Sequence, residues 1–158
     1  MIKFILMKLK IFVLLVISSF ALNSCNVDKC DILCNSGPLG LDFELLDQAT
    51  GENLFTNGTF DPADIEVLDL NDSNNSISFT FISENDRNII KLGPFGWGTN
   101  IVNYKLKVGE IEIFNLILDA EENKENCCSF VQINNLEIEN ADFEQNQETG
   151  IYEVLVTL

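Results

Sequence analysis

Short segments with a two-residue apolar period constrain the fold of this chain more than any other feature. In Leu41–Leu45 and Val102–Val108, apolar side chains mostly alternate with charged or polar ones. On a strand this alternation places one set of side chains in a core and the other in water. No stretch after residue 24 sustains a helical period. The segments with strand character on this basis, not all of them separate strands, are 41–45, 65–70, 77–81, 89–92, 102–108, 111–113, 127–133, 136–138 and 152–156.

Turn-forming residues separate these segments. Seven or eight short strands divided by Gly, Asn and Asp turns predict an all-β fold, an antiparallel β-sandwich. Asn57-Gly58 carries the strongest hairpin signal, because both residues accept a positive φ. Gly109 predicts a tight reversal between two antiparallel neighbours. The sequence also predicts a charged loop over Asp119–Asn126 and irregular structure over Gly93–Gly98, which holds three glycines and a proline in six residues.

Residues 1–24 have the pattern of a signal peptide. A basic start precedes an apolar run over residues 11–22, and the segment Leu22-Asn23-Ser24-Cys25 follows it. This tetrapeptide resembles a bacterial lipobox. The resemblance implies that the thiol of Cys25 receives a diacylglycerol, that the chain is cut before Cys25, and that the new amino group is acylated.

Two alternatives for the N-terminal segment stay open, namely cleavage without lipidation and retention as a membrane-spanning helix. The apolar run over residues 11–22 would form about 18 Å of helix, against a hydrocarbon core of about 30 Å. Extending that helix backwards would bury Lys3, Lys8 and Lys10, which is costly. Met7 is a second candidate start for the chain.

The chain beyond residue 24 has 134 of the 158 residues, the usual size of one domain. We expect a lipid-anchored tether and leading loop over 25–40 and one β-sandwich domain over 41–158. Removing residues 1–24 takes away three lysines and no acid, which changes the formal net charge from −16 to −19. Such a charge repels nucleic acid and anionic head groups. The expected partner is therefore a membrane, to which acyl chains attach the protein. The expected location is the outer membrane, on its periplasmic or cell-surface side.

The chain contains no histidine. Histidine-based acid–base catalysis, Ser-His-Asp and Cys-His nucleophiles and the usual zinc sites all require it. Asp69, Asn71 and Ser73 match the start of a calcium loop. However, Asn74 and Thr80 stand where that loop needs a glycine and a glutamate, so a solvated turn is expected. We expect no catalytic residue, no metal site and no cofactor.

If Cys25 carries lipid, four cysteines remain, an even number that suggests two disulfides in an oxidising compartment. Adjacent residues of a strand point to opposite faces, so Cys127 and Cys128 could join each other only through a strained ring. The favoured pairing links Cys30 and Cys34 with Cys127 and Cys128. The alternative links Cys30 to Cys34 and leaves a vicinal or intermolecular arrangement for the other two.

Phe95 and Trp97 are two large aromatic residues in the glycine-rich segment that should form a loop. Trp97 is the single tryptophan of the chain. An exposed pair would offer a stacking surface for a sugar ring or a contact for a protein partner. In the other interpretation the loop folds back and both rings close one end of the sandwich.

Four features recur in a family of small proteins. They are the lipobox cysteine, the strand Leu45-Leu46-Asp47 followed by Thr50-Gly51-Glu52-Asn53-Leu54-Phe55, the Cys127-Cys128 pair and a terminal Gly150-Ile151-Tyr152 strand. Together they resemble the small uncharacterised lipoproteins common in the Bacteroidota. The strand followed by Thr-Gly is also similar to transthyretin-like and carboxypeptidase-regulatory β-sandwich modules, which lack catalysis. The resemblance implies a location and a fold, and it carries no activity.

These observations lead to one expected function and two alternatives. We expect a lipid-anchored, non-catalytic binding or structural module of the cell envelope, with an envelope protein or a glycan as its partner. One alternative is an accessory carbohydrate-binding lipoprotein. The other is a lipid-anchored enzyme, which the missing histidine disfavours.

Overall fold

The computed structural model describes residue 34 and residues 37–158, except 85, 86, 98 and 126. The expected signal peptide, Cys25, Cys30 and most of the tether lie outside these described residues. Within them, no helix has the length and apolar character needed to cross a membrane. The elements are the strands β1 (Leu39–Asp47), β2 (Ile65–Asp69), β3 (Asn75–Ser76), β4 (Thr80–Glu84), β5 (Arg87–Phe95), β6 (Thr99–Val108), β7 (Ile111–Glu125), β8 (Cys128–Glu139), β9 (Asp142–Gln145) and β10 (Tyr152–Val156), and the 3-10 helix η1 (Pro62–Asp64).

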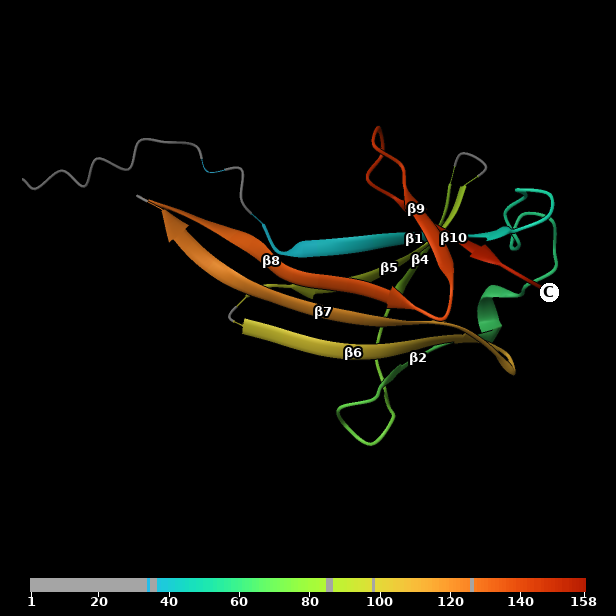
Figure 1. Cartoon of the computed structure of the whole chain (residues 1–158), viewed down its shortest axis with the longest axis horizontal. Coiled ribbons are helices and arrows are strands. Elements are labelled where there is room, and N and C mark those ends of the chain that lie inside the picture. The colour runs from blue at the N-terminus through green and yellow to red at the C-terminus, as the bar shows by residue number, and fades with distance from the viewer. Residues whose placement is uncertain (1–33, 35–36, 85–86, 98, 126) are drawn as a thin grey trace, which may run out of the picture. The chain divides into compact units, whose positions relative to one another are not determined.

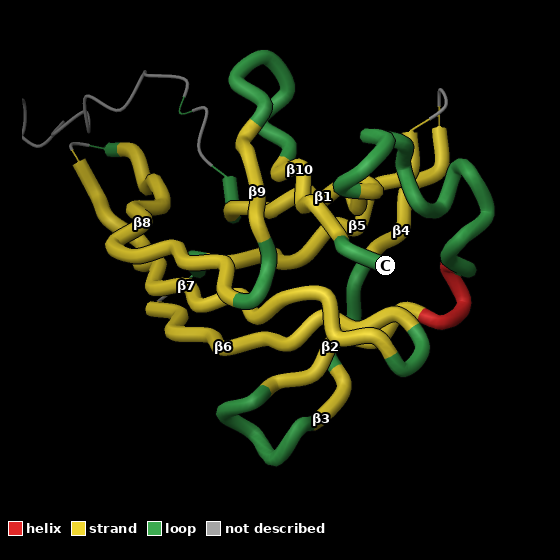
Figure 2. Tube along the Cα trace, turned by 45° about the vertical axis from the view of Figure 1, so that its right-hand side comes forward, coloured by secondary structure: helices red, strands yellow, loops and turns green. Residues whose placement is uncertain are grey.

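The strands form two five-stranded sheets that pack face to face (Figure 1). Sheet 1 has the order β4-β5-β1-β10-β9, and sheet 2 has the order β3-β2-β6-β7-β8. Figure 2 shows the long strands of sheet 2 running beneath β1, β5 and β10. The predicted all-β sandwich is confirmed. The described part of the chain holds ten strands, and β1 pairs with β10 in parallel, whereas the other strand pairs are antiparallel.

The core follows from the alternation in the sequence. Leu41, Phe43 and Leu45 are buried on the inner face of β1, and the residues between them are only partly covered. On β7, every second residue from Phe114 to Ala120 is buried in the same way. The rings of Phe43 and Phe114 meet across the two sheets, with centroids 5.0 Å apart. Among the described residues, all the buried side chains are apolar, so the interior holds the sheets together and offers no polar site.

The predicted charged loop at Asp119–Asn126 is wrong, because β7 continues through this segment to Glu125. Its acidic end pairs with β8, in a register that joins Glu125 to Cys128 and Glu122 to Val131. The two strands predicted at 127–133 and 136–138 are correspondingly one strand, β8. A charged side chain on a strand is costly where it would be buried without a partner, and the side chains at this end of β7 are half-buried or exposed, so the strand can continue.

Glycine-rich and Asn-rich segments account for the other differences. The predicted hairpin at Asn57-Gly58 is a series of turns, in which the amide of Asn57 donates to the carbonyl of Asn53 at 3.0 Å. The buried side chains of Phe55 and Phe60 hold these turns against the core. The glycine-rich segment is only partly irregular, because β5 continues through Gly93 to Phe95.

The strand predicted over 77–81 lies later in the chain than expected. Residues 77–79 connect sheet 2 to sheet 1, and the strand β4 begins at Thr80. Ile77 and Phe79 alternate because both pack against the core while the chain crosses between the layers. The strand β9 was not predicted, since its four residues are all exposed and give no apolar period. This edge segment is a strand because it pairs with β10, not because of an apolar pattern in its own sequence.

The two sheets approach closely where Gly96 follows β5. A Cβ atom on Gly96 would lie 2.4 Å from Cγ2 and 2.5 Å from Cγ1 of Val131, and the φ angle of Gly96 is +88°. We expect Gly96→Ala to lower the free energy of unfolding by about 2 to 4 kcal/mol, because overpacking adds to the strain of a positive φ. Thermal or denaturant unfolding measures this loss.

Gly58 supplies a matched control for Gly96. Its φ is +78°, yet a Cβ atom there would meet nothing within 4 Å. Gly58→Ala should therefore show the backbone strain alone, about 1 to 2 kcal/mol. Adding Val131→Ala to Gly96→Ala should recover part of the loss. Equal losses for Gly96→Ala and Gly58→Ala would contradict the close approach of the two sheets.

Candidate functional site

A disulfide joins the segment before β1 to the start of β8. Cys34 and Cys128 are bonded across a sequence separation of 94, with their Cα atoms 5.4 Å apart. The favoured pairing is confirmed for these two residues, and the alternative of a Cys30–Cys34 bond is wrong. Cys127 is also disulfide-bonded. The bond from Cys34 fixes the N-terminal side of the domain to the start of β8.

The structure separates the two aromatic candidates. Phe95 is 3% exposed and packs near Tyr104, with ring centroids 6.2 Å apart. Phe95 therefore fits the interpretation in which the ring closes one end of the sandwich, and it is no longer a candidate ligand contact. Trp97 is 62% exposed. It lines a small hollow of about 10 Å³ beside the start of β8. The other lining residues are Gly37, Gly96, Glu122, Ser129, Phe130 and Val131.

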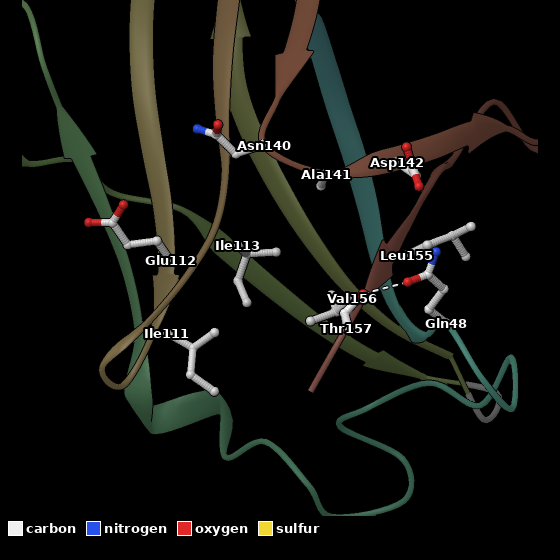
Figure 3. Close-up of a pocket in the computed structure, with 10 residues that line it drawn as sticks. All are labelled: Gln48, Ile111, Glu112, Ile113, Asn140, Ala141, Asp142, Leu155, Val156 and Thr157. Atoms are coloured by element: carbon white, nitrogen blue, oxygen red, sulfur yellow. Dashed lines mark hydrogen bonds between the residues drawn. The ribbon is translucent and has the colours of Figure 1, made fainter.

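A larger hollow lies where β1 ends and β7 begins, and Figure 3 shows the residues around it. Its volume is about 470 Å³, within the range of small-molecule sites. Three parts of the fold meet there, namely the turn after β1, the start of β7 and the chain around the ends of β8 and β10. The lining residues are Gln48, Ile111, Glu112, Ile113, Asn140, Ala141, Asp142, Leu155, Val156 and Thr157.

The polar groups of this hollow do not converge on one point. Figure 3 shows the carboxylates of Glu112 and Asp142 directed away from the side chains of Ile113 and Val156. Glu112 is bound instead by Lys105, with Nζ to Oε1 at 2.8 Å. The hydroxyl of Thr157 donates to the side-chain oxygen of Gln48, which joins the end of the chain to the turn after β1. Polar and apolar side chains share the lining, and the accessible lining is mainly polar, so the hollow offers a partner hydrogen-bonding groups beside apolar contact.

Electrostatic perturbation is found at Glu44, away from both hollows. Burial by its neighbours raises the pKa of the Glu44 carboxyl, the Arg87 guanidinium opposes the rise, and Glu153 adds to it. Glu153 is the direct partner of Glu44 in the parallel pairing of β1 with β10. Like charges side by side on a sheet are destabilising. Burial is thus the main cause of the raised pKa of Glu44, and the strand order adds the smaller repulsion of Glu153.

The raised pKa of Glu44 has a definite sign for stability. The folded state holds the proton more tightly than the unfolded state, whose ordinary value is 4.5. The contribution of Glu44 to stability is present below that pH and is lost as pH rises through the folded-state pKa. We expect Glu44→Gln to be more stable than the wild type at neutral pH, by less than about 1 kcal/mol because the group is partly exposed.

Denaturant unfolding of Glu44→Gln and wild type at pH 4 and pH 7 checks this sign. The stability of the variant relative to the wild type should improve between the two pH values. A relative stability that falls as pH rises would show that the attraction of Arg87 outweighs burial and the repulsion of Glu153.

The larger hollow was not found from the sequence. Its lining residues come from segments spread between Gln48 and Thr157, and no motif links them. The exposed residues Asn140 and Asp142 give no signal, because surface loops of acidic chains commonly contain Asn and Asp. The predicted turn at Asp69 is present, and the Asp69 carboxylate accepts the amide of Asn71 at 2.8 Å. Within the described residues, no group of three or more acidic or cysteine side chains is placed to hold a metal ion.

Comparison with protein-family models, curated proteins and solved structures found no significant match.

Proposed function

We propose that this protein is an exported, lipid-anchored protein of the outer membrane whose β-sandwich is a non-catalytic binding or structural module. The Cys34–Cys128 disulfide is the observation that carries the proposal. Disulfides form and persist in oxidising compartments and are rare in the cytosol. The bond therefore supports export, which is also what the signal-peptide pattern of residues 1–24 predicts.

The lipid anchor is supported by the lipobox-like segment that ends at Cys25. At a formal charge of −19 without residues 1–24, the domain has no electrostatic attraction to an anionic bilayer. Two or three acyl chains at about 0.8 kcal/mol per buried methylene hold a protein on a membrane almost permanently, whereas one chain does not. Lipid on Cys25 is thus the attachment that fits both the segment and the charge.

A binding role is supported by the hollow between Gln48 and Ile113. Its lining combines polar side chains with the apolar side chains of Ile113 and Val156, while Glu112 is paired with Lys105. Nucleophilic and acid–base catalysis need groups that converge on one reacting atom. The hollow is the surface on which we place a partner, an envelope protein or a glycan.

Substitution of Cys25 tests the anchor. In cells fed a labelled fatty acid, the wild-type chain should carry label and sediment with membranes. Cys25→Ala should lose the label to background and appear in the soluble fraction, because no other residue receives the diacylglycerol. Cys30→Ser is the matched control and should keep the label. A Cys25→Ala protein that is still labelled and still sediments with membranes would refute the proposal.

A further inference from the structure

We propose that the disulfide-linked end of the sandwich rests on the phospholipid bilayer, with Trp97 and Phe130 as the side chains that contact it. The bilayer is the same one that holds the lipid on Cys25, so this inference rests on the proposed function. It adds a fixed orientation of the domain, with the larger hollow directed away from the membrane.

The length of the chain before Cys34 is the first argument. Cys34 is nine positions after Cys25 in the sequence. A fully extended chain spans at most about 3.3 to 3.6 Å per residue, or about 30 Å over this distance. Because Cys34 is bonded to Cys128, this limit applies to the turn between β7 and β8 as well. The other end of β7 lies 14 residues away along a strand, roughly 45 Å at about 3.3 Å per residue.

Exposed apolar side chains gather at the end that the disulfide holds. Trp97 is 62% exposed and Phe130 is 40% exposed, and both line the small hollow that also includes Gly37. Gly37 is only three residues after Cys34. Tryptophan is enriched at the boundary between lipid and water, because the indole ring has an apolar body and one polar N–H group.

The charges near these rings indicate which lipid they meet. The end of β7 carries Glu121, Glu122 and Glu125 against a single Lys124. Anionic head groups would repel this end, whereas zwitterionic head groups present ammonium groups to the carboxylates. The surface that Trp97 and Phe130 contact is therefore a zwitterionic phospholipid bilayer, touched at the depth of the head groups; the small hollow itself, about 10 Å³, is too small to hold a ligand.

The single tryptophan makes the contact measurable. The lipidated full chain is purified in detergent and reconstituted into phosphatidylcholine vesicles that carry bromine at a shallow or a deep position on the acyl chains. Shallow bromine should quench Trp97 fluorescence about two-fold, and deep bromine much less, because an indole at the interface lies near the top of the chains. Phe130→Ser should reduce the shallow quenching. Leu158→Ser, which removes a 62% exposed apolar side chain from the far end of the domain, should leave it unchanged.

Each other result counts against the contact. If the protein floats with the vesicles but neither shallow nor deep bromine quenches Trp97, the proposed contact is wrong and the lipid anchor is still supported. A chain that does not float with vesicles would remove both the anchor and the contact. In a third outcome, bromine does not quench Trp97, but Trp97 becomes protected from quenching by acrylamide as the density of protein on the vesicles rises. That outcome would show that a second copy of the chain, and not lipid, covers Trp97.

Discussion

Replacing Cys34, Cys127 and Cys128 with serine should lower the free energy of unfolding by about 4 kcal/mol. The bond closes a loop with a sequence separation of 94, and in the chain-entropy model a loop of about 100 residues contributes nearly 5 kcal/mol by restricting the unfolded chain. The loss is a large fraction of the 5 to 15 kcal/mol typical of a domain. Denaturant unfolding of the wild type and the triple variant, without reductant, measures this loss.

All three substitutions are needed because Cys127 is itself disulfide-bonded, and a bond from Cys127 would still restrict the unfolded chain next to Cys128. Under full reduction the wild type and the triple variant should have nearly equal stability. This convergence is the control that separates the bond from side-chain packing. A loss below about 1 kcal/mol without reductant would show that the bond adds little constraint to the unfolded chain.

Phe114→Ala should cost about 3 to 5 kcal/mol, the range for truncating a buried phenylalanine. Phe114 is 1% exposed and meets Phe43 between the two sheets, with ring centroids 5.0 Å apart. The cavity would open in the middle of the core, where neither sheet can close it without moving against the other. Phe143→Ala is the matched control, because Phe143 lies on the edge strand β9 and is 37% exposed.

Thermal and denaturant unfolding of both variants gives the comparison. The control should lose about 1 kcal/mol or less, since surface substitutions usually have small effects. A double-mutant cycle with Phe43→Leu and Phe114→Leu should give a coupling energy of about 0.5 to 1.5 kcal/mol for the ring pair. Similar losses for Phe114→Ala and Phe143→Ala would contradict the packing of the sheets through this pair.

The fold class could be predicted from the alternating segments, because burial of one face of a strand requires apolar residues at every second position. Leu41, Phe43 and Leu45 show this alternation, and so does the run from Val102 to Val108. The order of the strands in a sheet produces no such pattern in the sequence. The parallel pairing of β1 with β10 joins residues 43–47 to 152–156, and nothing in either segment specifies its neighbour.

The cysteine pairing was predictable in part, since adjacent residues on a strand face opposite ways and Cys128 had to find a distant partner. The aromatic pair was not, because Phe95 and Trp97 have similar local sequence and differ only in what covers them. Phe95 still belongs to β5 and faces the core, while Trp97 follows Gly96 after the strand has ended. The larger hollow forms only when turns distant in the sequence meet, so no local pattern could predict it.

The intact mass of the protein purified from membranes, followed by that of its N-terminal and cysteine-containing peptides, tests the central claim most directly. The account predicts a chain that begins at Cys25 with a diacylglycerol on its thiol and acyl groups on its amine. It also predicts that the peptides with Cys34 and Cys128 stay joined until reductant is added. A chain that retains residues 1–24, or an unmodified Cys25 together with freely alkylated Cys34 and Cys128, would contradict it.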